Sequence, residues 1–246
     1  MAPTTTSTTT TTTPTTAPTH PSSSLPPPST TLATSLFGRV WTRIPISEHL
    51  VALTFDAGAN ADGLPSILAT LRAAGVPATF FLTGAFAREF PSLCREVASG
   101  GYRIGDHSVD HPYFTHLSDS QIRSEVLDAA GTITAVTGSD PSPLFRFPYG
   151  DSDARTLSVV NGLGYVAVGW TVDTLGWEGT SGGVTTQRVV DRVMDNLVPG
   201  EIVLMHVGSN PTDHSTLDAD ALPAIIGSLR SAGYSFVTLG SLVGSR

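Results

Sequence analysis

The sequence contains no lysine, only one cysteine and few charged residues in total. All 13 basic residues among the 246 are arginine, which excludes mechanisms that need a lysine, such as Schiff-base formation or a phosphate-loop lysine. The one cysteine, Cys94, allows neither an internal disulfide nor a cysteine-rich zinc site. Carboxylates, imidazoles and a bound metal are therefore the catalytic means left to this chain.

The chain also lacks basic clusters and long apolar runs. Its formal net charge is −8, and the absence of a basic run that could follow phosphates argues against nucleic acid and anionic membranes as partners. A neutral or cationic polymer remains compatible. No apolar run approaches the roughly 20 residues that cross a bilayer. Met1 is followed by Thr and Pro repeats instead of the basic and apolar regions of a signal peptide, so we expect none in this sequence.

The first 35 residues offer little apolar surface. Thr, Ser and Pro occupy 28 of these 35 positions, and none is Asp, Glu, Lys or Arg. Such a tract cannot bury enough apolar area to offset its chain entropy, which predicts a disordered linker or an O-glycosylated stalk over residues 1–38. A leader without function is the alternative. Residues 39–246 then form one folded domain. Because such stalks are commonest outside the cell, we expect a secreted or cell-surface protein.

From residue 50 onward, short apolar runs alternate with segments of helical period. Apolar residues three and four apart predict helices over 64–74, 86–98 and 184–197. Ser118 with Gln121 forms a capping-box signature for a further helix. The runs that we predict to be strands are 50–56, 78–84, 102–108, 144–150, 165–174, 201–208 and 235–240.

Seven strand–helix units in a row require a parallel sheet covered by helices, either closed as a barrel or open and doubly wound. The carboxyl ends of the strands converge on one face of a barrel, whereas in an open sheet they spread along an edge. Five polar residues at five strand ends converge more readily in a barrel. We therefore predict an α/β fold, a distorted TIM-like (β/α)7 barrel. These five residues are Asp56, His107, Arg146, Asp173 and His206.

His107 and His111 are four residues apart. If the chain is helical after Gly105-Asp106, their Cβ atoms lie about 5–6 Å apart on one face, close enough for both imidazoles to bind one metal ion. The simpler interpretation of such a pair is that both histidines are polar residues on either side of a turn, with no metal. The acidic and histidine residues at three other strand ends favour the metal site.

A metal with open coordination positions polarises a carbonyl and lowers the pKa of bound water, and hydrolysis then needs a base and an acid. Asp56 suits the base and His206 the acid. Arg146 would hold the Asp56 carboxylate, and Asp173 would orient His206 and raise its pKa. Taken singly, Asp56 suits a turn, Arg146 a structural ion pair and His206 the core. Their joint arrangement favours catalysis.

Five segments of the sequence match, in order, the motifs of a known family. They are 54–58 (TFDAG) against TFDDG, 107–112 (HSVDHP) against H-[ST]-x-x-H-P, 146–149 (RFPY) against R-x-P-Y, 173–177 (DTLGW) against D-x-x-D-W and 204–206 (LMH) against L-x-H. On these motifs the chain resembles the polysaccharide deacetylases with the NodB-homology domain, carbohydrate esterase family four. The resemblance covers residues 50–240 and implies the same distorted barrel.

The resemblance implies a metal-dependent hydrolase that removes N- or O-acetyl groups from a polysaccharide such as peptidoglycan, chitin or acetylxylan and releases acetate. In that scheme Asp56 matches the general base and His206 the general acid, with Arg146 and Asp173 as their partners. The backbone N–H of Tyr149 would help to stabilise the oxyanion. The residues that match an apolar substrate pocket for the acetyl methyl are Trp177, Leu204 and Pro148.

Two positions depart from the family motifs. Ala57 replaces the carboxylate that supplies the third metal ligand in most members, which leaves His107 and His111 as protein ligands. Zinc is the expected metal, with cobalt or manganese as alternatives. Gly176 replaces the second acidic residue of the fourth motif, whereas Trp177 is kept. The candidates for a third metal ligand are water, Asn60, Asp62, Asp106 and Asp110.

The loss at position 57 leaves a second interpretation open, a catalytically silent polysaccharide-binding domain of the same fold. The sequence retains both Asp56 with Arg146 and His206 with Asp173, and this argues against a silent domain, which has no physical reason to keep both pairs. A third interpretation is a metal amidohydrolase for a small molecule, in which loops such as 209–217 would close over the site. We expect a monomer.

Other residues with reactive side chains have plainer explanations. Cys94 is expected to pack within its helix. Asp151 and Asp153 are expected to cap the following helix. The residues expected in solvated loops, in the core or at the rim are His49, His116, His214, Trp41 and Trp170.

Overall fold

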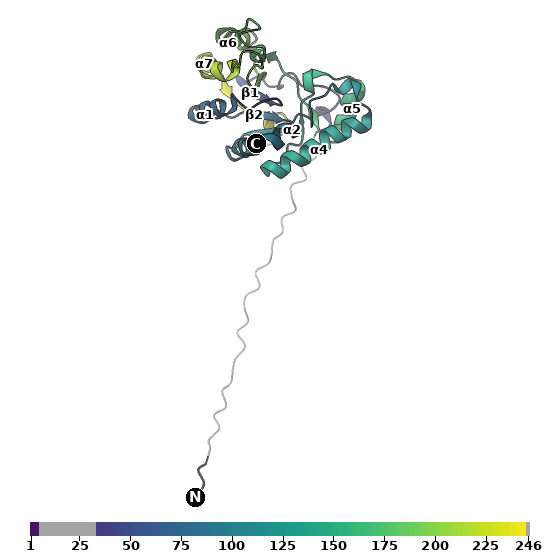
Figure 1. Cartoon of the computed structure of the whole chain (residues 1–246), viewed down its shortest axis with the longest axis vertical. Helices are drawn as coiled ribbons and strands as arrows, with labels where there is room; N and C mark the ends of the chain where they lie inside the picture. Colours follow the sequence, from purple (N-terminus) through teal and green to yellow (C-terminus); the bar gives the residue numbers. More distant parts are fainter. Residues whose placement is uncertain (5–32, 245–246) are drawn as a thin grey trace. The chain divides into compact units, whose positions relative to one another are not determined.

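The computed structural model of the chain describes residues 1–4 and 33–244 (Figure 1). Residues 5–32, most of the predicted linker or stalk, lie outside the described residues, so that prediction stays a prediction. The chain from Leu32 onward forms one compact unit. Leu36 and Phe37, which precede the predicted domain start, already pack against an apolar cluster of this unit. Within the described ranges, no helix is long and apolar enough to span a membrane.

Short strands alternate with helices along the folded unit. The strands are β1 (Leu50–Ala57), β2 (Thr79–Leu82), β3 (Arg103–Asp106), β4 (Leu144–Phe145), β5 (Val166–Ala167), β6 (Val172–Asp173), β7 (Glu201–His206) and β8 (Ser235–Phe236). The α-helices are α1 (Leu64–Ala74), α2 (Gly84–Glu89), α3 (Pro91–Ser99), α4 (Asp119–Thr137), α5 (Ala154–Gly162), α6 (Thr186–Asp195) and α7 (Leu217–Ser231). The 3-10 turns are η1 (Thr34–Leu36), η2 (Phe114–His116), η3 (Pro148–Gly150), η4 (Gly176–Glu178) and η5 (Leu239–Ser241).

One segment of the chain closes the sheet. The strand order is β5-β4-β3-β2-β1-β7-β6, with β8 beside β1. β5 and β6 belong to the same segment, residues 166–173, yet β5 pairs with β4 at one edge of the sheet and β6 pairs with β7 at the other. The curled parallel sheet is therefore closed into a distorted barrel, which confirms the predicted fold class. The single strand predicted over 165–174 is two short strands, because the chain changes partner between them.

Helices cover the outside of this sheet, with α1, α6 and α7 on one side of β1 and β2 and with α2, α4 and α5 on the other (Figure 1). In β1, the odd-numbered residues from Val51 to Ala57 belong to the outer apolar cluster, which the sheet shares with α1, α2, α3, α4, α6 and α7. The even-numbered Ala52 packs inside the barrel with residues of β2, β4, β5 and β7. By this period of two, Asp56 faces the barrel interior and Ala57 faces away from it.

The predicted elements differ from the observed ones mainly at their ends. Pro91 begins α3, so the helix predicted over 86–98 is two helices. The strand predicted over 144–150 keeps two residues as β4 before the chain turns into η3. The capping box of Ser118 and Gln121 at the start of α4 is confirmed. Cys94 is fully buried, and burial raises the pKa of its thiol to about 11, which agrees with a packing role.

One buried carboxyl group at the start of β7 has no partner. Glu201 is fully buried, and neither of its carboxyl oxygens has a hydrogen-bond partner among residues 33–244. Burial raises the pKa of Glu201 from 4.5 to about 7. Because the folded state then binds a proton that the unfolded state has lost, stability falls as the pH rises from 4.5 to about 7 and is constant above that range.

We expect Glu201→Gln to be more stable than the parent chain at pH 8, by up to about 3 kcal/mol, because each pKa unit corresponds to about 1.4 kcal/mol. Near pH 4 the two proteins should be equally stable. Urea unfolding at both pH values measures the difference. Glu89→Gln, at an exposed position in α2, is the control and should change little at either pH. A parent chain as stable as Glu201→Gln at pH 8 would contradict a buried, ionised Glu201.

Candidate active site

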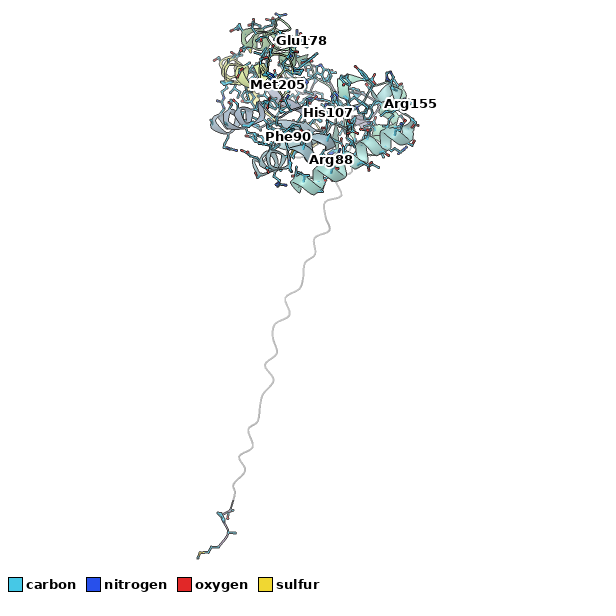
Figure 2. All side chains as sticks on the ribbon, viewed as in Figure 1. Arg88, Phe90, His107, Arg155, Glu178 and Met205 are labelled. Atoms are coloured by element: carbon cyan, nitrogen blue, oxygen red, sulfur yellow. The ribbon has the colours of Figure 1, made fainter. Side chains whose placement is uncertain are left out.

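A cavity of about 450 Å³ lies at the carboxyl ends of the strands. Asp56, His107, Asp173 and His206 line it, each from the end of a different strand or from the loop just after it. His107 lies near the middle of the folded unit (Figure 2). The fifth predicted residue, Arg146, directly follows β4 and contacts Asp56 without lining the cavity. The barrel thus brings together all five polar strand ends.

The Arg146 guanidinium is fully buried and donates hydrogen bonds to two parts of the barrel. Its Nη1 donates to Asp56 Oδ1 at 2.7 Å and to Thr54 Oγ1 at 3.0 Å. Its Nε and Nη2 donate to the carbonyl oxygens of Val168 and Gly169 in the closing segment. A buried charge that is paired and fully hydrogen-bonded avoids the large desolvation penalty of an unpaired one. Arg146 therefore fixes Asp56 relative to the barrel closure.

Asp56 is ionised in this setting. Burial alone would raise its pKa, but the Arg146 guanidinium, together with His107 and His206, lowers the pKa of Asp56 below its ordinary value. Arg146 holds Oδ1, while Oδ2 lies 3.3 Å from His107 Nε2. A carboxylate that is held at one oxygen and keeps the other beside a cavity is suited to accept a proton from water.

His107 and His111 lie close together, but not on a helix. The loop that carries them has no helical turn, and Ser108 and His111 have φ angles of 69° and 59°, so the condition under which the sequence brought them together is not met. The two rings are nonetheless 4.8 Å apart between centroids. Ser108 Oγ accepts the His111 N–H, and Glu125 of α4 accepts two further N–H groups of the loop. These side-chain acceptors define the loop shape.

The protonation of the two imidazoles suits a metal ion. His107 Nδ1 lies 2.9 Å from the Arg146 carbonyl oxygen, so this nitrogen carries the hydrogen and Nε2 is a bare acceptor. That acceptor faces a second acceptor, Asp56 Oδ2, and a cation beside them would stabilise the arrangement. Burial lowers the pKa of His107 and lowers that of His111 to about 4. Both imidazoles are therefore neutral near pH 7, and their donor set fits a divalent metal.

The structure offers no obvious side chain as a third ligand. Ala57 is buried in the outer apolar cluster. Within the described ranges, no three His, Cys, Asp or Glu side chains form a metal-binding group. The four substitutes that the sequence suggested do not line the cavity. Asn60 and Asp62 bind Ser209, and Asp110 pairs with Arg88. Asp106 accepts the Ser108 N–H through Oδ1, while its buried Oδ2 has no partner in the described part of the chain. Water is the remaining candidate at the cavity.

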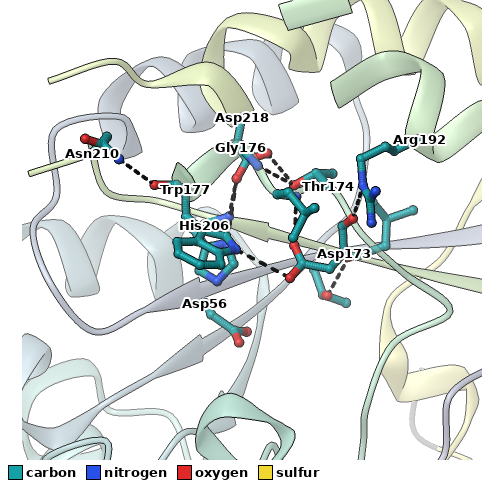
Figure 3. A network of polar contacts seen from close by, with 12 residues as sticks. Asp56, Asp173, Thr174, Gly176, Trp177, Arg192, His206, Asn210 and Asp218 are labelled. Carbon is teal, nitrogen blue, oxygen red and sulfur yellow. Dashed lines mark hydrogen bonds and ion pairs between the residues drawn. The ribbon is translucent and has the colours of Figure 1, made fainter. Parts of the chain in front are cut away.

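His206 is oriented by a residue that sequence reasoning missed (Figure 3). Its backbone N–H donates to Asp218 Oδ2 at 2.8 Å, and its Nδ1 lies 3.7 Å from the same oxygen. Asp173, the predicted partner, instead accepts the Leu175 N–H through Oδ1, and its Oδ2 lies 3.5 Å from Trp177 Nε1. An acidic residue in the first turn of a helix is ordinary, so the sequence around Asp218 carried no signal.

Three carboxylates act on the charge of His206. Burial alone would lower its pKa, but Asp218, Asp56 and Asp173 together outweigh burial and raise the pKa of His206 above its ordinary value. The imidazolium form therefore persists to a higher pH than in a free histidine. A protonated imidazole at the edge of a cavity is suited to donate a proton.

Two predicted pocket residues and the predicted oxyanion donor also lie at the cavity. Trp177 and Leu204 line it beside His206, whereas Pro148 is buried and is not among the lining residues. Tyr149 has a φ of 58°, which is rare for a residue with a side chain. Its backbone N–H donates to no acceptor in the part of the chain that the structure describes, so it is available to a ligand.

A family model described as polysaccharide deacetylase matches residues 44–168. The chain belongs to the polysaccharide deacetylase family. It is 34% identical over 198 residues to a peptidoglycan-N-acetylglucosamine deacetylase of Bacillus cereus, a match that covers 80% of this chain and 70% of that protein. The family confirms the predicted activity class, a carbohydrate esterase that hydrolyses acetyl groups on a polysaccharide.

Solved structures agree in fold. The crystal structure of the peptidoglycan N-acetylglucosamine deacetylase Bc1960 matches with a TM-score of 0.77 and 31% identity, over 86% of this chain and 95% of that one. The structure of BA3943 from Bacillus anthracis, described as a pseudoenzyme of carbohydrate esterase family four, matches with a TM-score of 0.76 and 27% identity, over 84% of this chain and 69% of that one. A protein named as a deacetylase and one described as a pseudoenzyme thus share this barrel.

The remaining predicted residues of the deacetylase domain lie outside the cavity, with one exception. Trp170 lines the cavity, and so do Phe147, Ser209 and Pro211, which sequence reasoning did not single out. Asp153 caps α5 as predicted. Asp151 does not cap that helix, because its carboxylate accepts hydrogen bonds from the Thr115 N–H and hydroxyl. Of the other residues expected in loops, in the core or at the rim, none lines the cavity: His49, His116, His214 and Trp41.

The deacetylase site depends on the planar guanidinium of Arg146, which a lysine cannot replace. We expect Arg146→Lys to lower the free energy of unfolding by about 3 kcal/mol, because one ammonium cannot bind Asp56, Thr54 and the closing segment together. Denaturant unfolding measures the loss. Arg72→Lys is the matched control, because its ion pair with Glu96 is exposed and should contribute less than about 1 kcal/mol. Equal effects of the two substitutions would contradict the role given to Arg146.

Proposed function

We propose that this chain removes N-acetyl groups from N-acetylglucosamine residues of an extracellular polysaccharide, with Asp56 as general base and His206 as general acid. One observation carries the proposal: across a single cavity the pKa of Asp56 is lowered and that of His206 is raised. Titratable groups whose environments drive their pKa values apart are typical of a base and its acid. The sugar and the location are supported by the Bacillus cereus relative, which is named as a peptidoglycan-N-acetylglucosamine deacetylase.

In this proposal each group holds or moves one proton. Asp56, held at Oδ1 by Arg146, accepts at Oδ2 a proton from the water that attacks the acetyl carbonyl carbon. The Tyr149 N–H donates to the carbonyl oxygen as it becomes negative. The C–N bond then breaks while His206 gives its proton to the sugar nitrogen, which yields acetate and a free amine. Trp177 and Leu204 contact the acetyl methyl.

We propose His107 and His111 as the protein ligands of a divalent metal, with zinc first and cobalt or manganese as alternatives. Two neutral imidazoles beside an ionised carboxylate are donors that these ions prefer. A bound metal would supply Lewis-acid polarisation of the acetyl carbonyl. The loop held by Glu125 would keep the imidazoles in place for it.

Exposed aromatic side chains at the cavity support a sugar polymer as substrate. Tyr113 stacks on Tyr149 with ring centroids 4.2 Å apart, and the two residues are 50% and 57% exposed. Trp177, next to His206, is 49% exposed. Rigid aromatic faces bind the apolar faces of rings at low entropic cost. We propose in addition that the domain acts as a monomer and that the Thr-, Ser- and Pro-rich residues 1–31, which precede the folded unit, are its linker or stalk.

A silent sugar-binding domain is the second candidate, because Ala57 lacks the carboxylate and a pseudoenzyme shares the fold. The 2.7 Å ion pair of Arg146 with Asp56, and the carboxylates that surround His206, favour the enzyme. Binding a sugar requires neither a buried ion pair at the base nor an imidazole with a raised pKa.

Chelator-treated protein that is reloaded with zinc, cobalt or manganese is expected to bind about one ion per chain. His107→Ala and His111→Ala should each weaken binding at least about tenfold, because each removes an imidazole ligand. His116→Ala, at an exposed position outside the cavity, is the control and should bind like the parent. Calorimetry with metal analysis measures both. Less than about 0.1 ion per chain with all three metals would overturn the site.

The reloaded protein should release acetate from N-acetylated chitooligosaccharides or peptidoglycan and not from acetylxylan. We expect His206→Ala to lower kcat/KM about 10²- to 10⁴-fold, the usual contribution of a general acid, and His116→Ala to leave it unchanged. A coupled acetate assay measures the release. No release from any polymer would support the silent domain, release from acetylxylan alone would contradict the N-acetyl substrate, and an active His206→Ala would remove His206 from the mechanism.

A further inference from the structure

The fourth sequence motif lacks its second acidic residue, and the space that such a side chain would enter is filled from elsewhere. Gly176 stands at that position. A Cβ atom added to Gly176 would lie 2.6 Å from Asp218 Cγ, far inside a normal contact distance. Asp218 comes from the first turn of α7. A side chain at 176 and the Asp218 carboxylate therefore exclude each other.

The Asp218 carboxylate is buried and has defined contacts (Figure 3). Asp218 is 3% exposed. Its Oδ1 accepts the Thr174 hydroxyl at 2.6 Å, and its Oδ2 accepts the backbone N–H of His206 at 2.8 Å. The same Oδ2 lies 3.7 Å from His206 Nδ1, which has no hydrogen-bond partner among residues 33–244. Asp218 is thus the carboxylate nearest to the inner nitrogen of the proposed acid.

Asp173 has a different set of contacts. Its carboxylate accepts the Leu175 N–H and lies near Trp177 Nε1, and its backbone carbonyl accepts Arg192 Nε at 2.7 Å. No hydrogen bond or ion pair joins Asp173 to His206 in the described part of the chain. Asp173 therefore acts on His206 only through its charge and holds Trp177.

We propose that Asp218 is the positioning residue of His206 and that it supplies, from α7, the carboxylate that the motif lacks at position 176. The inference rests on the proposed role of His206 as general acid. Held at its backbone N–H and beside Nδ1, the imidazole keeps Nε2 for the cavity that it lines. The Asp218 charge also stabilises the imidazolium before its proton moves to the leaving nitrogen.

Several groups face His206 and contribute to its titration. Asp218 comes from α7, Asp56 from β1 and Asp173 from β6, and all three favour the imidazolium. His107 and His111 interact with it from the loop after β3. Because Asp218 is both nearest to Nδ1 and hydrogen-bonded to the same residue, its neutralisation should lower the pKa of His206 more than neutralisation of Asp173 does.

The first test compares Asp218→Asn, Asp173→Asn and Asp220→Asn in the metal-loaded full chain. Asp220 is the matched control, because it is an exposed acidic residue in the same first turn of α7. We expect Asp218→Asn to lower the His206 pKa, followed by NMR of its ring, and the alkaline limb of the kcat/KM profile by about one pH unit. The shift in Asp173→Asn should be smaller, and that in Asp220→Asn should be absent. An unchanged His206 pKa in Asp218→Asn, or a larger shift in Asp173→Asn, overturns the proposal.

The second test moves the carboxylate back to the motif position. Asp218→Ala should lower kcat/KM about 100-fold, and the double variant Gly176→Asp/Asp218→Ala should recover at least about tenfold of that loss. Gly176→Asp alone should lower the melting temperature, because two carboxylates then compete for one space. A double variant no more active than Asp218→Ala overturns the replacement. The NMR titration of His206 needs no turnover, so it tests the positioning role even if the proposed deacetylation fails.

Discussion

The site is organised around one buried positive charge. The Arg146 guanidinium binds the proposed base Asp56 and the closing segment of the barrel in a single hydrogen-bond network. Phe81 packs against it inside the barrel, with its ring centroid 4.2 Å from the guanidinium carbon. Phe81 in turn requires Gly105, since a Cβ there would lie 2.6 Å from its ring. Interior packing, barrel closure and the ionisation of Asp56 are therefore parts of one arrangement.

Much of this site could be predicted because parallel strands end on the same face of a barrel. That constraint alone places Asp56, His107 and His206 together, whatever the loops between them do. The sequence did not show why His107 and His111 lie close together. Their spacing suggested a helix, but Ser108 and His111 have left-handed φ angles, in a loop whose N–H groups are accepted by Ser108 Oγ within the loop and by Glu125 of α4.

Other features were hidden because they depend on contacts between distant segments. The apolar-rich run over 165–174 predicts one strand, and only the structure shows that its two ends pair with different strands. Asp218 is separated from Gly176 by more than 40 positions, and nothing in either segment alone relates them. The two departures from the motifs also differ in kind. The acidic group missing at 176 has a substitute in space, whereas Ala57 sits in an apolar cluster that offers none.

The closing segment divides the chemistry along the chain. The proposed base, its arginine and both imidazole ligands precede residue 166, whereas the proposed acid, Asp173 and Asp218 follow residue 171. The two groups meet because β1 pairs with β7 in a register that sets Asp56 beside His206, while β5 and β6 lie at the two edges of the sheet. Each half of the reaction is thus encoded in its own stretch of sequence. Gly176 and Asp218, the carboxylate proposed to replace the missing acidic group, both lie in the second stretch. Substitutions at these two positions therefore alter the surroundings of the proposed acid and leave the residues of the proposed base unchanged.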